Sequence, residues 1–231
     1  VLLGIPMKRA LGSALAVVAL AAPVGVATEF FTEPKHLVLG MAALVATGGQ
    51  AGVLLGARLV RRVPSSKLKT AFILLLVFVA LRNLGIFGGI PESGLASSMG
   101  QPGLFTEPSW IWVAALLLGF VGGLCAVLFG VGGGVVVVPG LIFVVGGIPF
   151  HYATGISLLA MVPTSMTGVA LAMKDGRVSG SLVKRLAPAA LVEASFGVWI
   201  RNRWMEPSFL AVLFAIFLLY TAWNLLNRDS E

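Results

Sequence analysis

Four glycines and a proline interrupt a strongly apolar part of the chain. They lie in the run Gly130-Val131-Gly132-Gly133-Gly134, which is followed by four valines and Pro139. In a helix interior each glycine costs roughly 1 kcal/mol and a proline about 3 kcal/mol relative to alanine, so the run predicts a broken helix. The N–H groups freed at such a break can bind an anion. We therefore expect Gly130, Gly132, Gly133 and Gly134 to contact an anionic substrate, with close helix packing as the alternative.

Hydroxyl side chains are concentrated in the next apolar stretch, residues 151–173. Thr154, Ser157 and Ser165 fall near one face at helical spacing. Hydroxyl groups can donate hydrogen bonds to anionic oxygens once water has been removed, so we expect Thr154 and Ser157 to contact the substrate. The alternative is that these hydroxyls donate to carbonyl groups of their own helix.

Glu193 is the acidic residue that we place deep within a membrane-spanning segment. An ionised carboxylate there costs about 2.5–3.5 kcal/mol, which makes it a functional candidate. We expect Glu193 to carry a coupling proton; a structural contact with Gln50 or with a nearby hydroxyl group is the alternative. His36 and His151 are isolated and near loops, and Cys125 is the single cysteine, in an apolar run. These residues suggest no metal site, cofactor or catalytic triad, so we do not expect an enzyme.

The segments that must position these residues are those of an integral membrane protein. The chain has 231 residues, of which 58% are hydrophobic and 11% charged, against about 25% charged residues in soluble domains. We predict an all-α polytopic fold in which a glycine-interrupted pair, 111–130 and 134–146, accompanies membrane-spanning segments near 10–31, 38–59, 68–87, 151–173, 181–200 and 208–227. The net charge of +7 lies in short clusters between apolar runs, which does not favour nucleic-acid binding.

The two sides of a Gly/Ser/Pro-rich linker at 88–109 repeat each other. Gly4-Ile5-Pro6 matches Gly147-Ile148-Pro149 at an offset of 143, and further small residues follow at offsets of 143 and 141. We therefore divide the chain into a first transmembrane repeat, 1–87, and a second, 110–231, that contains the glycine motif. The second repeat has a segment ahead of Gly147 that has no counterpart ahead of Gly4 in the first repeat. If the two repeats are alike in length, we expect about 33 further residues ahead of Val1.

The distribution of Lys and Arg predicts the relative orientation of the two repeats. With parallel repeats, nine basic residues would face the cytoplasm and seven would face outward; with inverted repeats the numbers are twelve and four. The positive-inside rule favours the inverted arrangement. Inversion requires an even number of crossings between Trp110 and Gly147. Either the segments 111–130 and 134–146 both cross the membrane, or together they form a re-entrant hairpin.

The order of these motifs resembles that of the TauE/SafE family, also called the sulfite or toluene-sulfonate uptake permease family. The resemblance is carried by the glycine run with Pro139, by Gly147-Ile148-Pro149, by 153–158 (Ala-Thr-Gly-Ile-Ser-Leu) and by 52–59 (Gly-Val-Leu-Leu-Gly-Ala-Arg-Leu). It implies a multi-pass transporter of the plasma (inner) membrane, built from two related halves and associated with organosulfur anions such as sulfonates and sulfite.

We therefore expect a secondary transporter, a permease or exporter, of a small anion such as a sulfonate or sulfite. The alternative is a non-transporting or incomplete membrane subunit that needs a partner segment. The expected partners are the anionic substrate and the lipid bilayer, without nucleic acid, and assembly into a homo-oligomer is left open. Alternating access would come from rocking of one half against the other.

Overall fold

Helices make up the fold of this protein in the computed structural model, which describes residues 6–83, 109–146, 148–205 and 207–227. No strand occurs in these ranges. The helices are α1 (Met7–Thr32), η1 (Pro34–His36), α2 (Leu39–Arg62), α3 (Ser65–Asn83), α5 (Ser109–Phe129), α6 (Gly134–Gly140), η3 (Leu141–Gly146), α7 (Phe150–Lys174), α8 (Gly180–Trp204) and α9 (Pro207–Asn227). The predicted all-α fold is confirmed, while the predicted linker 88–109 lies, except for Ser109, outside the described residues.

Four helices in the described ranges are long and apolar enough to cross a membrane. They are Met7–Thr32, Leu39–Arg62, Trp110–Phe129 and Phe150–Lys174. Shorter apolar helices cover Thr70–Leu81, Gly134–Val145 and Val212–Asn224. About 20 apolar residues are enough to span the hydrocarbon core, so this bundle has the dimensions of a multi-pass membrane protein.

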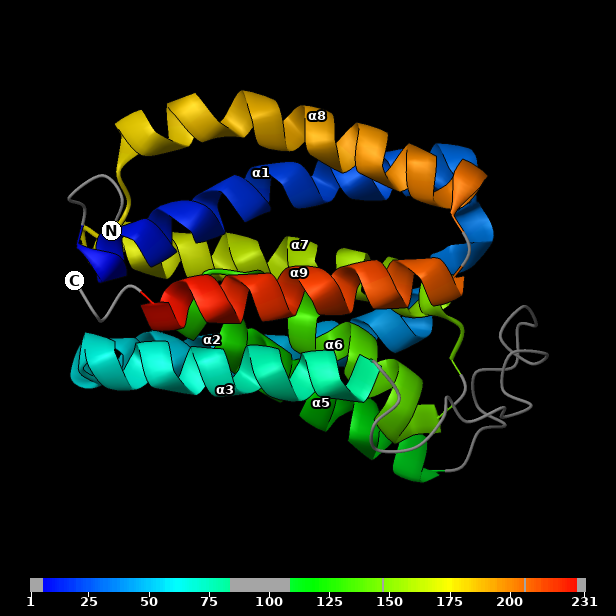
Figure 1. The fold of residues 1–231 in the computed structure, drawn as a ribbon, viewed down its shortest axis with the longest axis horizontal. Helices are drawn as coiled ribbons and strands as arrows, with labels where there is room; N and C mark the ends of the chain where they lie inside the picture. The colour runs from blue at the N-terminus through cyan, green and yellow to red at the C-terminus, as the bar shows by residue number, and fades with distance from the viewer. Residues whose placement is uncertain (1–5, 84–108, 147, 206, 228–231) are drawn as a thin grey trace.

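The long helices lie side by side, and both chain termini are at the same end of the bundle (Figure 1). At that end the Lys8 ammonium donates to the Arg61 carbonyl at 3.4 Å, and Arg61 pairs with Asp175 at 3.5 Å. The start of α1 therefore lies beside the ends of α2 and α7. The backbone N–H of Ser179 donates to Ser13 Oγ at 2.9 Å, which places the start of α8 at this end too.

The offset of 143 pairs residues of α1 with residues of α7, and the offset of 141 pairs residues of α2 with residues of α8. The two helices of each pair run in opposite directions. Gly12 of α1 packs against Arg177, and Gly25 packs against Leu158 of α7, so α1 and α7 are antiparallel. Likewise α2 ends at the same end of the bundle at which α8 begins, so α2 and α8 are antiparallel. Opposite directions are what an inverted repeat requires; the repeat itself stays a prediction from the sequence.

Glycine allows the backbones of α2 and α5 to approach closely. A Cβ atom at Gly52 would lie 2.0 Å from the carbonyl oxygen of Phe120, and one at Gly123 would lie 2.1 Å from that of Gly49. Apolar association gives little driving force between helices in lipid, so such close packing of small residues holds membrane helices together. The α2–α5 pair forms a rigid support for the glycine-rich turn that follows α5.

The predicted break in the helix is present between α5 and α6. Gly130, Gly132 and Gly133 have φ angles of +72°, +73° and +82°, a region that residues with a side chain rarely adopt. The chain then folds back: Gly133 lies against Gly122, and Gly140 lies against Leu118. The turn contacts Leu11 and Val18, which are within α1 and not beyond its end. Helices α5 and α6 therefore form a hairpin, the arrangement that the two predicted alternatives for 111–130 and 134–146 share; the choice between two crossings and a re-entrant hairpin stays a prediction.

Candidate functional site

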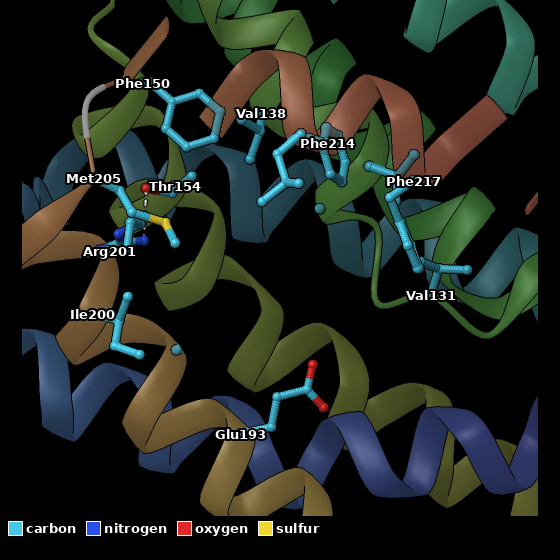
Figure 2. A pocket seen from close by; sticks show the side chains of 14 residues that line it. Val131, Val138, Phe150, Thr154, Glu193, Ile200, Arg201, Met205, Phe214 and Phe217 are labelled. Atoms are coloured by element: carbon cyan, nitrogen blue, oxygen red, sulfur yellow. Dashed lines mark hydrogen bonds between the residues drawn. The ribbon is translucent and has the colours of Figure 1, made fainter. Parts of the chain in front are cut away.

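A cavity of about 820 Å³ lies between α6, α7, α8 and α9 (Figure 2). Three residues singled out from the sequence line it: Gly134 from α6, Thr154 from α7 and Glu193 from α8. Most of its wall is apolar and includes Val138 and Phe214. A cavity of this volume with a few converging polar groups has the properties of a small-molecule site.

Arg201 brings a positive charge to this cavity. Its side chain is 12% exposed and donates from Nη1 to Thr154 Oγ1 at 2.9 Å. Figure 2 shows this contact at one end of the cavity, with Glu193 further along α8. Arg201 is the only cationic residue among the described residues that line the cavity. A guanidinium group offers a planar set of donors that matches carboxylate, sulfonate and phosphate oxygens.

Glu29 of α1 is the buried anionic partner of Arg201. Its side chain is fully buried and forms an ion pair with Arg201 Nη2. Asn202 Nδ2 donates to the same carboxylate oxygen at 2.9 Å and to Thr32 Oγ1 at 2.8 Å. His36 Nδ1 lies 2.7 Å from the other oxygen, Glu29 Oε1. Buried charges need such partners because an unpaired charge in an apolar interior is very costly.

The two histidines are adjacent in the fold, so the prediction that they are isolated is wrong. The rings of His36 and His151 are stacked with their centroids 5.4 Å apart, and the Tyr152 ring meets His36 edge-on at 5.1 Å. Among the described residues, buried His151 Nδ1 has no hydrogen-bond partner. Packing of η1 on the start of α7 brings the histidines together: a Cβ atom at Gly155 would lie 2.4 Å from the His36 carbonyl oxygen.

A second cavity of about 270 Å³ adjoins the same network. Its lining residues are Thr32, Glu33, Trp199, Asn202 and Arg203. Asn202 reaches this cavity, Arg201 reaches the larger one, and Glu29 bonds to both residues. The Glu29–Arg201–Asn202 network therefore separates the two cavities.

The predicted glycine and hydroxyl contacts fall into two groups. Gly134 and Thr154 line the large cavity, whereas Gly132, Gly133 and Ser157 line a void of only about 10 Å³. Gly130 lines neither and packs against α1. Ser157 Oγ is buried without a partner in the described part of the chain, and a Cβ atom at Gly134 would lie 3.3 Å from it. Substrate contact by these residues stays a prediction.

Glu193 is exposed to the large cavity and has no hydrogen bond or ion pair among the described residues. Its alternative assignment, as a structural partner of Gln50, is therefore not supported. Glu29, which lies inside the predicted span 10–31, is not among the residues predicted for the site. An ionisable residue in such a span is itself a signal of function. Arg201 and Asn202 gave a weaker signal because they follow the predicted span 181–200.

The comparison with protein families matches residues 1–83 and 115–231 to the family described as sulfite exporter TauE/SafE. The matched ranges include all the described residues that line the large cavity and all those of the Glu29–Arg201–Asn202 network. No match was found among curated proteins or among solved structures.

Proposed function

Because the chain belongs to the sulfite exporter TauE/SafE family of membrane transporters, we propose that it is a secondary transporter of an organic sulfonate or of sulfite. In this proposal the anion binds in the large cavity, with its oxygens on Arg201 and on Thr154, whose hydroxyl would turn from the His151 carbonyl oxygen to which it donates in the structure. The observation that carries the proposal is the Arg201 guanidinium at the wall of an otherwise largely apolar cavity.

The shape and chemistry of the cavity favour an anion with an apolar group over a bare inorganic ion. A volume of about 820 Å³ far exceeds the space that sulfite needs. The walls from α6, α8 and α9 present Val138, Ile200 and Phe214, which would remove apolar substituents from water. A sulfonate places three oxygens at one end of such a molecule and matches the arginine at one end of the cavity.

The glycine break contributes to this site in two ways. Gly130, Gly132 and Gly133 allow the turn that brings α6 back along α5, and Gly134 then lies at the cavity wall. Ser157, next to Gly134, has a buried hydroxyl group without a partner among the described residues, but it lines the small void and not the large cavity. Alternating access would follow from movement of one half of the bundle relative to the other, as in other secondary transporters with broken helices.

The plasma (inner) membrane is the proposed location, and assembly into a homo-oligomer is a further part of the proposal. Helix α8 presents an exposed apolar face that includes Val192, Phe196 and Trp199. In a bilayer this face would contact lipid or a second copy of the chain. Chemical crosslinking of the reconstituted protein would distinguish the two.

Substitution of Arg201 by lysine tests the proposed binding site. Lys keeps the positive charge but loses the planar set of donors, so Arg201→Lys should weaken sulfonate binding by about tenfold to a hundredfold. Binding of methanesulfonate, toluenesulfonate, sulfite and acetate to the purified full chain would be measured by titration calorimetry. Arg203→Lys is the matched control, because Arg203 is on the same helix but lines only the smaller cavity.

The control variant should bind with the affinity of the unmodified chain. Equal affinities for the unmodified chain and Arg201→Lys would rule out Arg201 as the anion ligand. No binding of any of the four anions by the unmodified chain would contradict the proposed function as a whole.

A further inference from the structure

We propose that Glu29 competes with the transported anion for Arg201, and that a proton on Glu29 releases Arg201, so that one proton moves with each anion. This inference rests on the proposed function, in which Arg201 binds the anion. It adds the identity of the coupling ion and of the residue that carries it, and it assigns this role to Glu29 instead of Glu193.

Four of the five N–H donors of Arg201 are occupied in the structure. Nη1 donates to Thr154, Nη2 donates to Glu29 and Asn202, and Nε donates to Asn202 at 3.1 Å. An oxyanion that binds to two guanidinium donors at once must therefore displace one of these acceptors. Glu29 is the only anionic acceptor among them, so the Glu29 carboxylate occupies the position on the guanidinium that an anionic ligand would take.

Displacement of Glu29 from Arg201 would leave a buried negative charge without its positive partner. The Glu29 side chain is 0% exposed, and removing one partner from a buried ion pair is strongly destabilising. Uptake of a proton removes this charge. Two states then have the same buried charge: ionised Glu29 paired with Arg201, and protonated Glu29 with the substrate anion on Arg201.

His36 gives the proton a route to Glu29. When Glu29 is ionised, His36 Nδ1–H donates to Oε1 across 2.7 Å. Transfer of that proton to Glu29, with a proton taken up at Nε2 from solution, leaves a neutral histidine of the other tautomer. Histidine suits this relay because each of its two ring nitrogens can hold or accept a proton.

The other charged and titratable groups near Glu29 come from each element packed against α1. Helix α7 brings His151 and Tyr152 to His36, and α8 brings Arg201 and Asn202. The turn between α1 and α2 carries the Glu33–Lys35 pair, with the two groups 3.0 Å apart and exposed to solvent. The sequence of α5 contains no Asp, Glu, Lys, Arg or His. Glu29 is thus the buried carboxylate of this network.

Proton movement during methanesulfonate uptake tests the inference. Methanesulfonate is ionised throughout the range of about pH 5 to pH 8, so any pH dependence comes from the protein. The full chain would be reconstituted in vesicles that contain a pH-sensitive dye, and labelled methanesulfonate would be followed together with internal pH. We expect uptake driven by an inward proton gradient, with about one proton moved per anion.

Glu29→Gln should separate anion binding from proton movement. The amide cannot ionise and so cannot hold Arg201 as an ion pair; methanesulfonate binding should then be independent of pH, and anion exchange should continue without proton flux. Glu33→Gln, a partly exposed residue one turn further along, should keep the coupling of the unmodified chain. Glu193→Gln changes the wall of the anion cavity, so only its ratio of protons to anions is compared, and this ratio should stay at about one.

Methanesulfonate uptake by the unmodified chain without proton movement would overturn the inference, and this result does not depend on whether Glu29→Gln folds. The same result would leave the proposed function standing. Proton coupling that persists in Glu29→Gln, or that is lost in Glu193→Gln alone, would also overturn it. Absence of methanesulfonate, toluenesulfonate and sulfite transport at every pH would contradict both the proposed function and the inference.

Discussion

The side chain of Glu29 is held by His36 from η1 and by Arg201 and Asn202 from α8. Each partner is far from Glu29 in the sequence except His36, which follows it by seven positions. A carboxylate, a guanidinium and an imidazole together can exchange a proton and an anion, whereas the lone carboxylate of Glu193 in an open cavity has no such partners. At the scale of residues, the chemistry is therefore concentrated at the end of α1.

Gly133 is a residue at which backbone conformation alone predicts a large effect. Its φ is +82°, and a Cβ atom would lie 2.6 Å from the Gly122 carbonyl oxygen. Gly133→Ala should destabilise the protein by about 1–3 kcal/mol or more, measured as loss of thermal stability in detergent. Gly180→Ala is the control, because a Cβ atom at Gly180 meets nothing within 4 Å. Equal stability of the two variants would contradict this prediction.

Helices α2 and α5 show how elements in this protein are held together. Their glycines face each other's backbones, so the two helix axes can approach more closely than in a pair with larger side chains. The hairpin of α5 and α6 then carries Gly134 to the wall of the large cavity. Thus the glycines of α2 and α5 determine the position of Gly134 at the cavity wall.

Two glycines of α2 provide a graded test of this packing. A Cβ atom at Gly52 would lie 2.0 Å from the Phe120 carbonyl oxygen, whereas one at Gly56 would lie 3.1 Å from that of Leu124. Gly52→Ala should therefore cost about 1–3 kcal/mol by forcing the helices apart, and Gly56→Ala should cost less. Thermal unfolding of the purified variants measures the difference. A larger loss for Gly56→Ala would show that the α2–α5 contact is not the stabilising one.

At the scale of the whole molecule, basic residues gather at one end of the bundle. Lys8, Arg61 and Arg177 lie at the end that contains both termini, and Glu29, His36 and Arg201 lie at the other. The positive-inside rule assigns the first end to the cytoplasm. His36 would then lie toward the outer end of the bundle, where the proposed relay takes up its proton.

Cysteine labelling in intact cells tests this orientation. After replacement of Cys125 by alanine, Lys67→Cys and Lys184→Cys should react only once the cytoplasm is accessible, and Lys35→Cys should react with an impermeant reagent from outside. All three lysines are exposed. Labelling of Lys67→Cys and Lys184→Cys from opposite sides would contradict the inverted orientation of the two halves.

The sequence by itself determined which segments become helices, that they enter a membrane, where the helix breaks and where basic residues cluster. These properties depend on local composition: long apolar runs favour membrane helices, and four glycines within five residues disfavour a continuous helix. Thr154, Gly134 and Glu193 could therefore be singled out before the fold was known, and all three line one cavity.

Only the tertiary structure decided which of these residues meet and which partners they have. Glu29 and Arg201 are 172 positions apart, and no periodicity within α1 or α8 indicates that they form an ion pair. Packing of α1 against α8 and of η1 against α7 brings one carboxylate, one guanidinium and two imidazoles together. Burial then makes each partner necessary, because a charge removed from water must be compensated by its neighbours.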